Sequence, residues 1–390
     1  MNNHCELCRH DALEPVYEAE GSSRGLKIHI CRHCGLVQSL PRIDRAPRRA
    51  AAASGGADWG NIRYGKGFRT KQALAALSAH ADLTQDLSLL DVGSNRGSFA
   101  RAFLEAAPSA TITAIEPDER VADACKDFPR TELVAARIED TALESERFDI
   151  VHSCHTIEHL AEPARMLADH WRALKPGGLL ILDAPSTAFL DSDDIIEEWF
   201  IDKHLYHFSG RTLMRMVAAA GFDIIDPPDL ADRENLLIVA HKSDRAHPAS
   251  EADPREVAEA ERLIAAYGAT RAANLSALTA VAAELTSLAP KRVVLWGAGR
   301  LFDTLVTHGG LMPAMLQGVI DAPLRAHLPT RHGCDLKAPE DLAELDPGVV
   351  VVMSRAFAGE IVEHAQHLAP NAEIITYGEL MSRARLARAA

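Results

Sequence analysis

The chain has 390 residues, of which 47% are hydrophobic and 25% charged, a composition typical of globular rather than disordered proteins. Its 41 basic and 55 acidic side chains give a formal net charge of −14, which argues against a nucleic-acid substrate because binding phosphates needs a basic face. The sequence shows no secretory signal pattern and no apolar run near the roughly 18 residues of a membrane span. With an odd number of cysteines, seven, this predicts a cytoplasmic protein without a disulfide framework.

Four of the cysteines form two pairs near the N-terminus. Cys5-x-x-Cys8 and Cys31-x-x-Cys34 offer four thiolates, the ligand set of a closed tetrahedral zinc site. Because four thiolates leave no open position for a substrate, the predicted zinc is structural. We therefore expect a small zinc-ribbon module over residues 1–45, followed by a linker over residues 45–58.

Residues 60–245 alternate apolar strands with helical periods, which predicts a mostly parallel sheet covered on both faces. A second polar linker over 242–254 and one or two helices over 255–288 precede a shorter α/β pattern, so that a third domain is expected over residues 255–390. The strands predicted for the middle domain are 88–92, 111–115, 132–135, 150–153, 179–184, 222–225 and 236–241, and those for the last domain are 292–296, 316–320, 349–353 and 373–376.

The first strand of the middle domain runs directly into a glycine turn. The loop reads Asp91-Val-Gly-Ser-Asn-Arg-Gly97 and leads into a predicted helix over 98–107. Such a turn lets a ligand approach the backbone closely at the carboxyl edge of a parallel sheet. Alone, the turn indicates only a nucleotide-binding fold.

Carboxylates follow the next two strands at spacings that suit a nucleoside. Glu116 lies 23 positions after Gly93, where an acidic side chain can accept from both ribose hydroxyls. Glu139 and Asp140 follow the third strand, where one carboxylate would accept from an adenine amino group. Further on, Leu-Lys-Pro-Gly-Gly over 174–178 predicts the end of a helix before the strand at 179.

These motifs together resemble the class I S-adenosylmethionine-dependent methyltransferases over about 150 residues. The resemblance implies a Rossmann-like α/β domain with S-adenosylmethionine as cofactor. By position, the implied cofactor-binding residues are Asp91, Gly93, Ser94, Asn95, Gly97, Glu116, Pro117, Glu139, Asp140 and His155.

The sequence His155-Thr-Ile-Glu-His159 also matches His-x-x-Glu-His, a metalloprotease pattern. That pattern needs a long helix and a further carboxylate ligand, whereas here it follows a predicted strand. We therefore expect His155 to lie beside the cofactor and His159 to face the substrate.

A second group of proton-carrying side chains lies before a predicted helix over 210–220, for which Ser209 is the expected N-cap. A methyl acceptor must lose a proton, and a histidine with its pKa near neutrality suits that task. The predicted catalytic residues are His204, His207, His159 and Tyr206. The alternative is that they cap or pack against the helix.

The three-part layout is similar to that of the sugar C-methyltransferases, which act on nucleotide-linked keto-deoxysugars. That resemblance implies a small-molecule acceptor, a nucleotide sugar or related glycan or natural-product intermediate, with no nucleic-acid or membrane partner. The family's Tyr-His-Glu-His stretch falls on residues 201–204, where only His204 matches, and only His159 matches a second family pair. Carbon and oxygen acceptors both remain open, and the sequence does not reveal the oligomeric state.

The last domain contains a second glycine turn. Gly297-Ala-Gly299 follows a predicted strand, and Asp321 lies 24 positions after Gly297, but Phe302 replaces the third glycine of the dinucleotide fingerprint. This turn either helps to bind the substrate nucleotide or is scaffold alone. Two other functions stay open: an NAD-dependent oxidoreductase or epimerase that uses this turn, and a non-catalytic zinc-bearing interaction protein.

Overall fold

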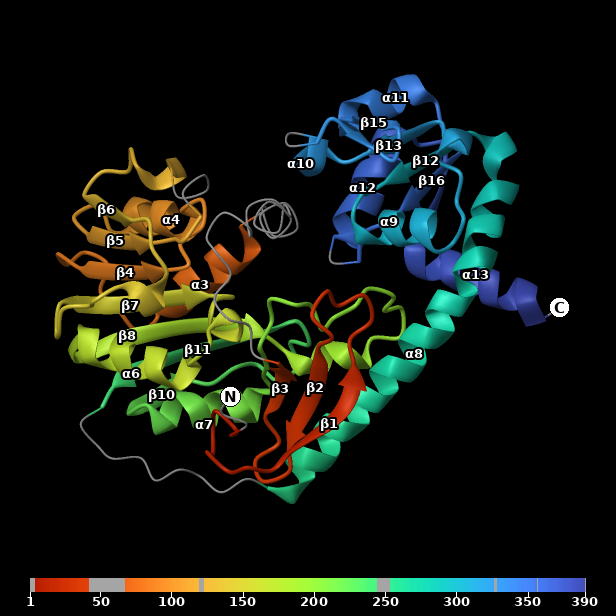
Figure 1. Ribbon diagram of the computed structural model, residues 1–390. Coiled ribbons are helices and arrows are strands. Elements are labelled where there is room, and N and C mark those ends of the chain that lie inside the picture. The colour runs from red at the N-terminus through yellow and green to blue at the C-terminus, as the bar shows by residue number, and fades with distance from the viewer. Residues whose placement is uncertain are drawn as a thin grey trace. The chain divides into compact units, whose positions relative to one another are not determined.

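The computed structural model describes residues 4–41, 67–118, 123–243, 253–325, 328–355 and 357–389 (Figure 1). The chain forms two compact units, one made of Met1–Asp191 with Phe200–Ala265 and the other of Ser192–Trp199 with Ala266–Ala390. The predicted linker over 45–58, and most of the one over 242–254, lie outside the described residues. Within the described ranges, no helix is long and apolar enough to cross a membrane.

The first unit is built around a seven-stranded sheet with the order β10-β11-β8-β7-β4-β5-β6. β11 runs antiparallel to both of its neighbours, and the other pairs are parallel. The strands are β4 Ser88–Val92, β5 Thr111–Ile115, β6 Thr131–Val134, β7 Phe148–Cys154, β8 Leu174–Pro185, β10 Phe222–Asp226 and β11 Asn235–Lys242. All seven predicted strands are confirmed. The predicted end of a helix before this strand is confirmed, because the helix Pro163–Ala173 ends there, although β8 itself begins at Leu174, ahead of a register shift in its pairing with β7.

Helices cover both faces of this sheet (Figure 1). α3 Phe68–Ser78 and α4 Ser98–Ala106 pack on the face that Leu89 joins, and α6 Pro163–Ala173 and α7 Gly210–Ala219 pack on the face that Leu90 joins. Adjacent strand residues reach opposite cores because side chains alternate along a strand. Because β4 pairs in parallel with both β5 and β7, the carboxyl ends of the three strands lie at the same edge of the sheet, between the two helical layers.

The cysteine-bearing segment forms a second, four-stranded sheet. β1 Leu13–Glu18, β2 Lys27–Cys31 and β3 Val37–Leu40 pair in antiparallel fashion, and β3 pairs in turn with β9 Tyr206–His207. Cys5, Cys31 and Cys34 share a hydrophobic core with residues of α6 and α7. The segment is thus integrated with the first unit rather than separated from it.

The second unit contains a six-stranded sheet with the order β14-β15-β13-β12-β16-β17. Its strands are β12 Val293–Trp296, β13 Gly318–Ile320, β14 Thr330–Arg331, β15 Cys334–Lys337, β16 Val349–Val352 and β17 Glu373–Thr376, with helices α9 Arg300–Thr307, α10 Ala322–Arg325, α11 Leu342–Leu345, α12 Ala358–Leu368 and α13 Tyr377–Ala389. All pairs except β14–β15 are parallel. The segment predicted as one or two helices is a single helix, α8 Pro254–Ser287.

The stretch 192–199 lies within the predicted middle domain in sequence but belongs to the second unit in space. Arg355 holds it there, with contacts of 2.5 Å to Asp194 and 3.1 Å to Glu197. Asn274 of α8 adds a hydrogen bond of 2.9 Å to the carbonyl oxygen of Ile195. The second unit therefore includes a segment that lies between two segments of the first unit in the sequence.

Candidate functional site

The loop between β4 and α4 depends on residues with left-handed backbone. Gly93, Asn95 and Gly97 have φ values of 71°, 50° and 72°. A Cβ atom at Gly93 would collide with the Thr156 hydroxyl, and one at Gly97 would collide with the Cys125 sulfur. Because both conformation and space exclude side chains, glycine is required at both ends of this turn.

Glu116 follows β5 and lies against this loop. Its carboxylate accepts hydrogen bonds from the backbone amides of Asn95, at 3.0 Å, and Asp118, at 2.9 Å. The residue is only 9% exposed, and burial raises the pKa of its carboxyl group. Each carboxylate oxygen has a second lone pair, so that the group can still accept from the two hydroxyls of a ribose.

Asp91, at the start of the loop, makes a contact that sequence reasoning missed. One of its carboxylate oxygens lies 2.8 Å from Nδ1 of His152, whose ring stacks on Phe99 at 3.6 Å. Among the described residues, the other oxygen has no hydrogen-bond partner although Asp91 is 1% exposed. The pairing of β4 with β7, which sets Asp91 opposite His152, was the available signal.

The other predicted cofactor residues lie at the same sheet edge. Pro117 directly follows Glu116 and is half-buried, and Ser94 is buried within the loop. Glu139 and Asp140 lie in a short 3₁₀ turn, Ile138–Asp140, after β6, with Glu139 half-buried and Asp140 exposed. Because β5 and β6 pair in parallel, the turn after β6 follows the same edge of the sheet as Glu116, which comes after β5.

A histidine–glutamate cluster begins where β7 ends. His155, with a φ of 47°, follows the strand, and Glu158 and His159 lie in the 3₁₀ turn Ile157–His159. One oxygen of Glu158 lies 3.6 Å from Nδ1 of His155 and 3.6 Å from Nε2 of His159. His155 also bonds Asn235 of β11 through Nε2, at 3.1 Å. Burial raises the pKa of Glu158 to about 8.

His204 completes this cluster from a distant part of the chain. The ligand atoms of Glu158, His159 and His204 all lie within 4.8 Å of one another. Burial, followed by the charges of His159 and His207, lowers the pKa of His204 well below its ordinary value. Two of the predicted catalytic residues, His159 and His204, are thus brought together, and Glu158 was missed because no local pattern reveals its burial.

The other two predicted catalytic residues, Tyr206 and His207, are held in β9. The Tyr206 hydroxyl donates to the carbonyl oxygen of Ala161 at 2.9 Å, and Nε2 of His207 lies 2.9 Å from the Ser39 hydroxyl. Both side chains are buried, and burial lowers the pKa of His207 to about 3. These contacts favour a structural role for both residues, and their catalytic role stays a prediction.

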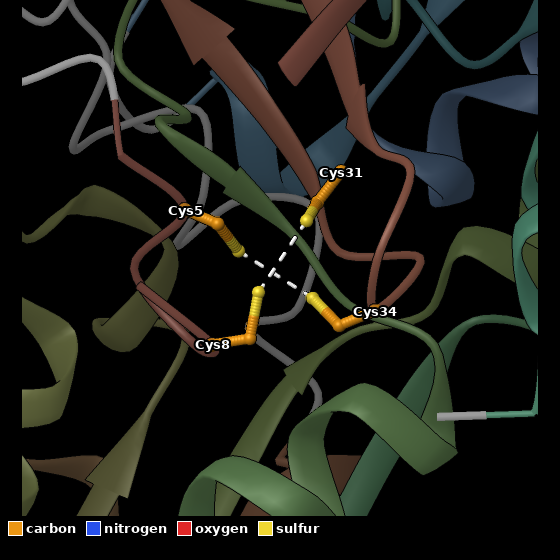
Figure 2. A group of neighbouring side chains, drawn as sticks. All are labelled: Cys5, Cys8, Cys31 and Cys34. Carbon is orange, nitrogen blue, oxygen red and sulfur yellow. Dashed lines mark hydrogen bonds between the residues drawn. The ribbon is translucent and has the colours of Figure 1, made fainter. Parts of the chain in front are cut away.

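The four N-terminal cysteines converge on one point (Figure 2). The sulfurs of Cys5 and Cys34 lie 3.4 Å apart, those of Cys8 and Cys31 lie 3.5 Å apart, and all four lie within 4.8 Å of one another. A tetrahedron with Zn–S bonds of about 2.3 Å has sulfurs about 3.8 Å apart. The four residues therefore fit a tetrahedral metal ion.

The glycine turn of the second unit is built like that of the first. Gly297 has a φ of 118°, and the carboxylate of Asp321 accepts from the amides of Ala298, at 2.9 Å, and Leu324, at 3.0 Å. Phe302, at the third fingerprint position, is buried in α9. Asp321, which follows β13, thus contacts the glycine loop of the second unit as Glu116 contacts that of the first.

Comparison with known proteins bears on residues 65–226, which match the family described as "Methyltransferase domain". Over 150 residues the chain is 25% identical to an uncharacterised 37.1 kDa transposon protein of Streptomyces fradiae, covering 35% of this chain and 44% of that one. It is also 36% identical over 104 residues to an uncharacterised methyltransferase of Mycolicibacterium gilvum, covering 25% and 39%. The chain thus spans about two fifths of the length of these curated relatives.

Among solved structures, the chain is similar to the 1,6-didemethyltoxoflavin-N1-methyltransferase of Burkholderia thailandensis, which was crystallised with S-adenosylhomocysteine. The identity is 21%, the match covers 58% of this chain and 100% of that one, and the TM-score is 0.40. The matched family covers the glycine loop, Glu116 and the histidine–glutamate cluster. Residues 65–226 thus match a methyltransferase family model and fold as a Rossmann-like α/β domain.

Proposed function

We propose that the protein transfers a methyl group from S-adenosylmethionine to a small molecule, a nucleotide-linked sugar or a related glycan or natural-product intermediate. The observation that carries the methyl-transfer part is Glu116, a buried carboxylate held against the glycine loop by the Asn95 amide at 3.0 Å. This is the arrangement that a nucleoside with two ribose hydroxyls needs.

S-adenosylmethionine supplies an electrophilic methyl group when bound. Glu116 would accept from its ribose hydroxyls, and Glu139 or Asp140 would accept from the adenine amino group. The loop from Asp91 to Gly97 would lie along the sugar and the methionine part. The oxygen of Asp91 that lacks a hydrogen-bond partner among the described residues is suited to accept from an ammonium group.

The acceptor would react between this loop and the histidine–glutamate cluster. The Thr156 hydroxyl lies directly over Gly93 and also contacts the carbonyl oxygen of Val92 at 3.3 Å. Thr156 therefore contacts the loop, and it lies between His155 and His159 in the sequence. In the transfer, a bond forms between the acceptor atom and the methyl carbon, and the carbon–sulfur electron pair goes to sulfur. The proton of the acceptor leaves toward the cluster of His159 and His204.

One feature excludes a class of acceptor, and another supports a nucleotide-linked one. The net charge of −14 disfavours nucleic acid. The Asp321 carboxylate against the Gly297 loop is an arrangement that suits a second nucleotide. Carbon and oxygen methylation both stay within the proposal, because only His204 matches the base stretch of the resembled sugar C-methyltransferases.

We also propose that Cys5, Cys8, Cys31 and Cys34 hold a structural zinc ion. The spacing of their sulfurs supports it, and four thiolates would close the coordination sphere. Such an ion would stabilise the β1–β3 sheet rather than take part in methyl transfer.

The test of the proposed function is mass spectrometry of the purified full-length protein incubated with S-adenosylmethionine and a panel of nucleotide sugars. The expected product is heavier than its acceptor by one CH₂ group, with S-adenosylhomocysteine formed in equal amount. A parallel set with NAD tests the oxidoreductase alternative. Turnover of NAD without methylation of any acceptor would overturn the proposal.

A further inference from the structure

The histidine–glutamate cluster contains a buried carboxylate that lacks the usual compensation. Glu158 is 1% exposed, and neither of its oxygens has a hydrogen-bond partner among the described residues. Buried carboxylates are otherwise hydrogen-bonded or paired, because an isolated buried charge costs several kcal/mol. Burial raises the pKa of Glu158, and its own backbone amide and the charge of Arg69 offset this only in part.

The surrounding histidines turn lone pairs, not protons, toward this carboxylate. Nδ1 of His159 lies 2.9 Å from the carbonyl oxygen of Lys203, which can only accept, so that the proton is on Nδ1 and the lone pair on Nε2. That Nε2 atom lies 3.6 Å from Oε1 of Glu158.

His155 repeats this pattern from another direction. Its Nε2 atom donates to Oδ1 of Asn235 at 3.1 Å, which leaves a lone pair on Nδ1, and Nδ1 lies 3.6 Å from the same oxygen of Glu158. A distance of 3.6 Å is too long for a shared proton to form a hydrogen bond. The nearest nitrogens of His155 and His159 thus both approach Oε1 of Glu158 at distances beyond hydrogen-bond length.

We propose that Glu158, His159 and His204 bind a divalent transition-metal cation. Their ligand atoms lie within 4.8 Å of one another, a spread that a central ion at about 2.0–2.2 Å from each ligand can close with small side-chain movements. The backbone carbonyl that fixes the His159 tautomer is the outer contact usual for a metal-binding histidine. Two imidazoles and one carboxylate suit zinc, iron or manganese and leave open coordination positions.

The role of this ion rests on the proposed methyl transfer, although its binding does not. An open position beside the Thr156 turn would accept a hydroxyl oxygen of the acceptor and lower the pKa of that hydroxyl. With the ion bound, His159 and His204 would be its ligands and not proton acceptors. The proton would then leave to solvent, and the oxygen would attack the methyl group while the carbon–sulfur electron pair goes to sulfur. The His-x-x-Glu-His pattern would thus contribute its glutamate and second histidine to a site completed by His204, not a protease site.

The test is cobalt binding by the purified full-length protein, followed by metal analysis and visible absorption. Co²⁺ on the four cysteines gives intense thiolate charge-transfer bands, whereas Co²⁺ on imidazole and carboxylate ligands gives only weak d–d bands. We expect the wild type to bind one equivalent of Co²⁺ that gives thiolate bands and a second equivalent that gives only weak d–d bands. Glu158→Gln, which keeps the side-chain size, and His204→Ala should each lose the equivalent with weak bands and keep the thiolate bands.

His33→Gln is the matched control, because His33 forms a further cluster with Cys8 and His10 among the described residues, where an extra ion could also bind. This variant should keep both equivalents. The proposal is overturned if the wild type binds cobalt only with thiolate bands, or if Glu158→Gln binds as much as the wild type. Calorimetry with S-adenosylmethionine on the same samples separates the two proposals, since failure of the metal site leaves cofactor binding intact.

Discussion

Glu116 is the residue on which the proposed cofactor binding should depend most directly. Glu116→Ala removes the carboxylate that would accept from both ribose hydroxyls, and hydrogen bonds to a charged group contribute about 1.5–3 kcal/mol each. We expect its affinity for S-adenosylmethionine, measured by calorimetry, to fall at least about 100-fold. Glu105→Ala, on the exposed side of α4, is the control and should bind like the wild type. Unchanged affinity in Glu116→Ala would refute the assignment.

His204 is the predicted catalytic residue that the structure places in the histidine–glutamate cluster. His204→Ala should lower turnover by about 10²–10⁴-fold, because the acceptor would lose either its proton acceptor or a ligand of the ion that activates it. Affinity for S-adenosylmethionine should stay close to that of the wild type. A wild-type rate in steady-state methylation assays would rule out a role for His204 in the reaction.

At the residue scale, the sequence was informative where the relevant signal was local. The glycines and Glu116 follow strands at fixed spacings, and the structure places them together. Glu158 and the contact between Asp91 and His152 depend on burial and strand pairing. Neither burial nor strand pairing can be inferred from neighbouring residues in the sequence, which is why the site was predicted only in part.

Among the elements, α7 has the clearest local stabilisation. Ser209 caps it as predicted, accepting from the Thr212 amide at 3.2 Å, while the Thr212 hydroxyl accepts from the Ser209 amide at 2.9 Å. Ser209→Ala should lower the free energy of unfolding by about 1 kcal/mol in urea titrations, whereas Ser209→Asn should stay close to the wild type. Equal losses in both variants would show that the cap is not the cause.

Most strands of the seven-stranded sheet and of the six-stranded sheet were predictable because each is an apolar run between turn residues, whereas β9, β14 and β15 were not predicted. The exceptions are short or paired at long range. β9 has two residues and joins β3 across more than 160 positions of sequence, and β14 also has only two residues. A two-residue strand has no periodicity, so only its partner identifies it.

For the whole molecule, the cysteine cluster links local metal binding to the stability of the first unit. Cys5, Cys31 and Cys34 belong to the same core as α6 and α7. Removing the proposed zinc with a strong chelator should therefore lower the melting temperature and reduce β-sheet circular dichroism, because binding energy is folding energy in such sites. Cys8→Ser should mimic chelation and Cys334→Ser, in the second unit, should not. A melting curve insensitive to the chelator would contradict a structural zinc.

The central claim is that the loop from Asp91 to Gly97, with Glu116, is a site for S-adenosylmethionine. Isothermal titration calorimetry of the full-length wild type with S-adenosylmethionine and, separately, with NAD tests it most directly. The predicted result is saturable binding of one S-adenosylmethionine at this loop, lost in Glu116→Ala, and no displacement of it by NAD. Absence of S-adenosylmethionine binding by the folded protein would contradict the claim.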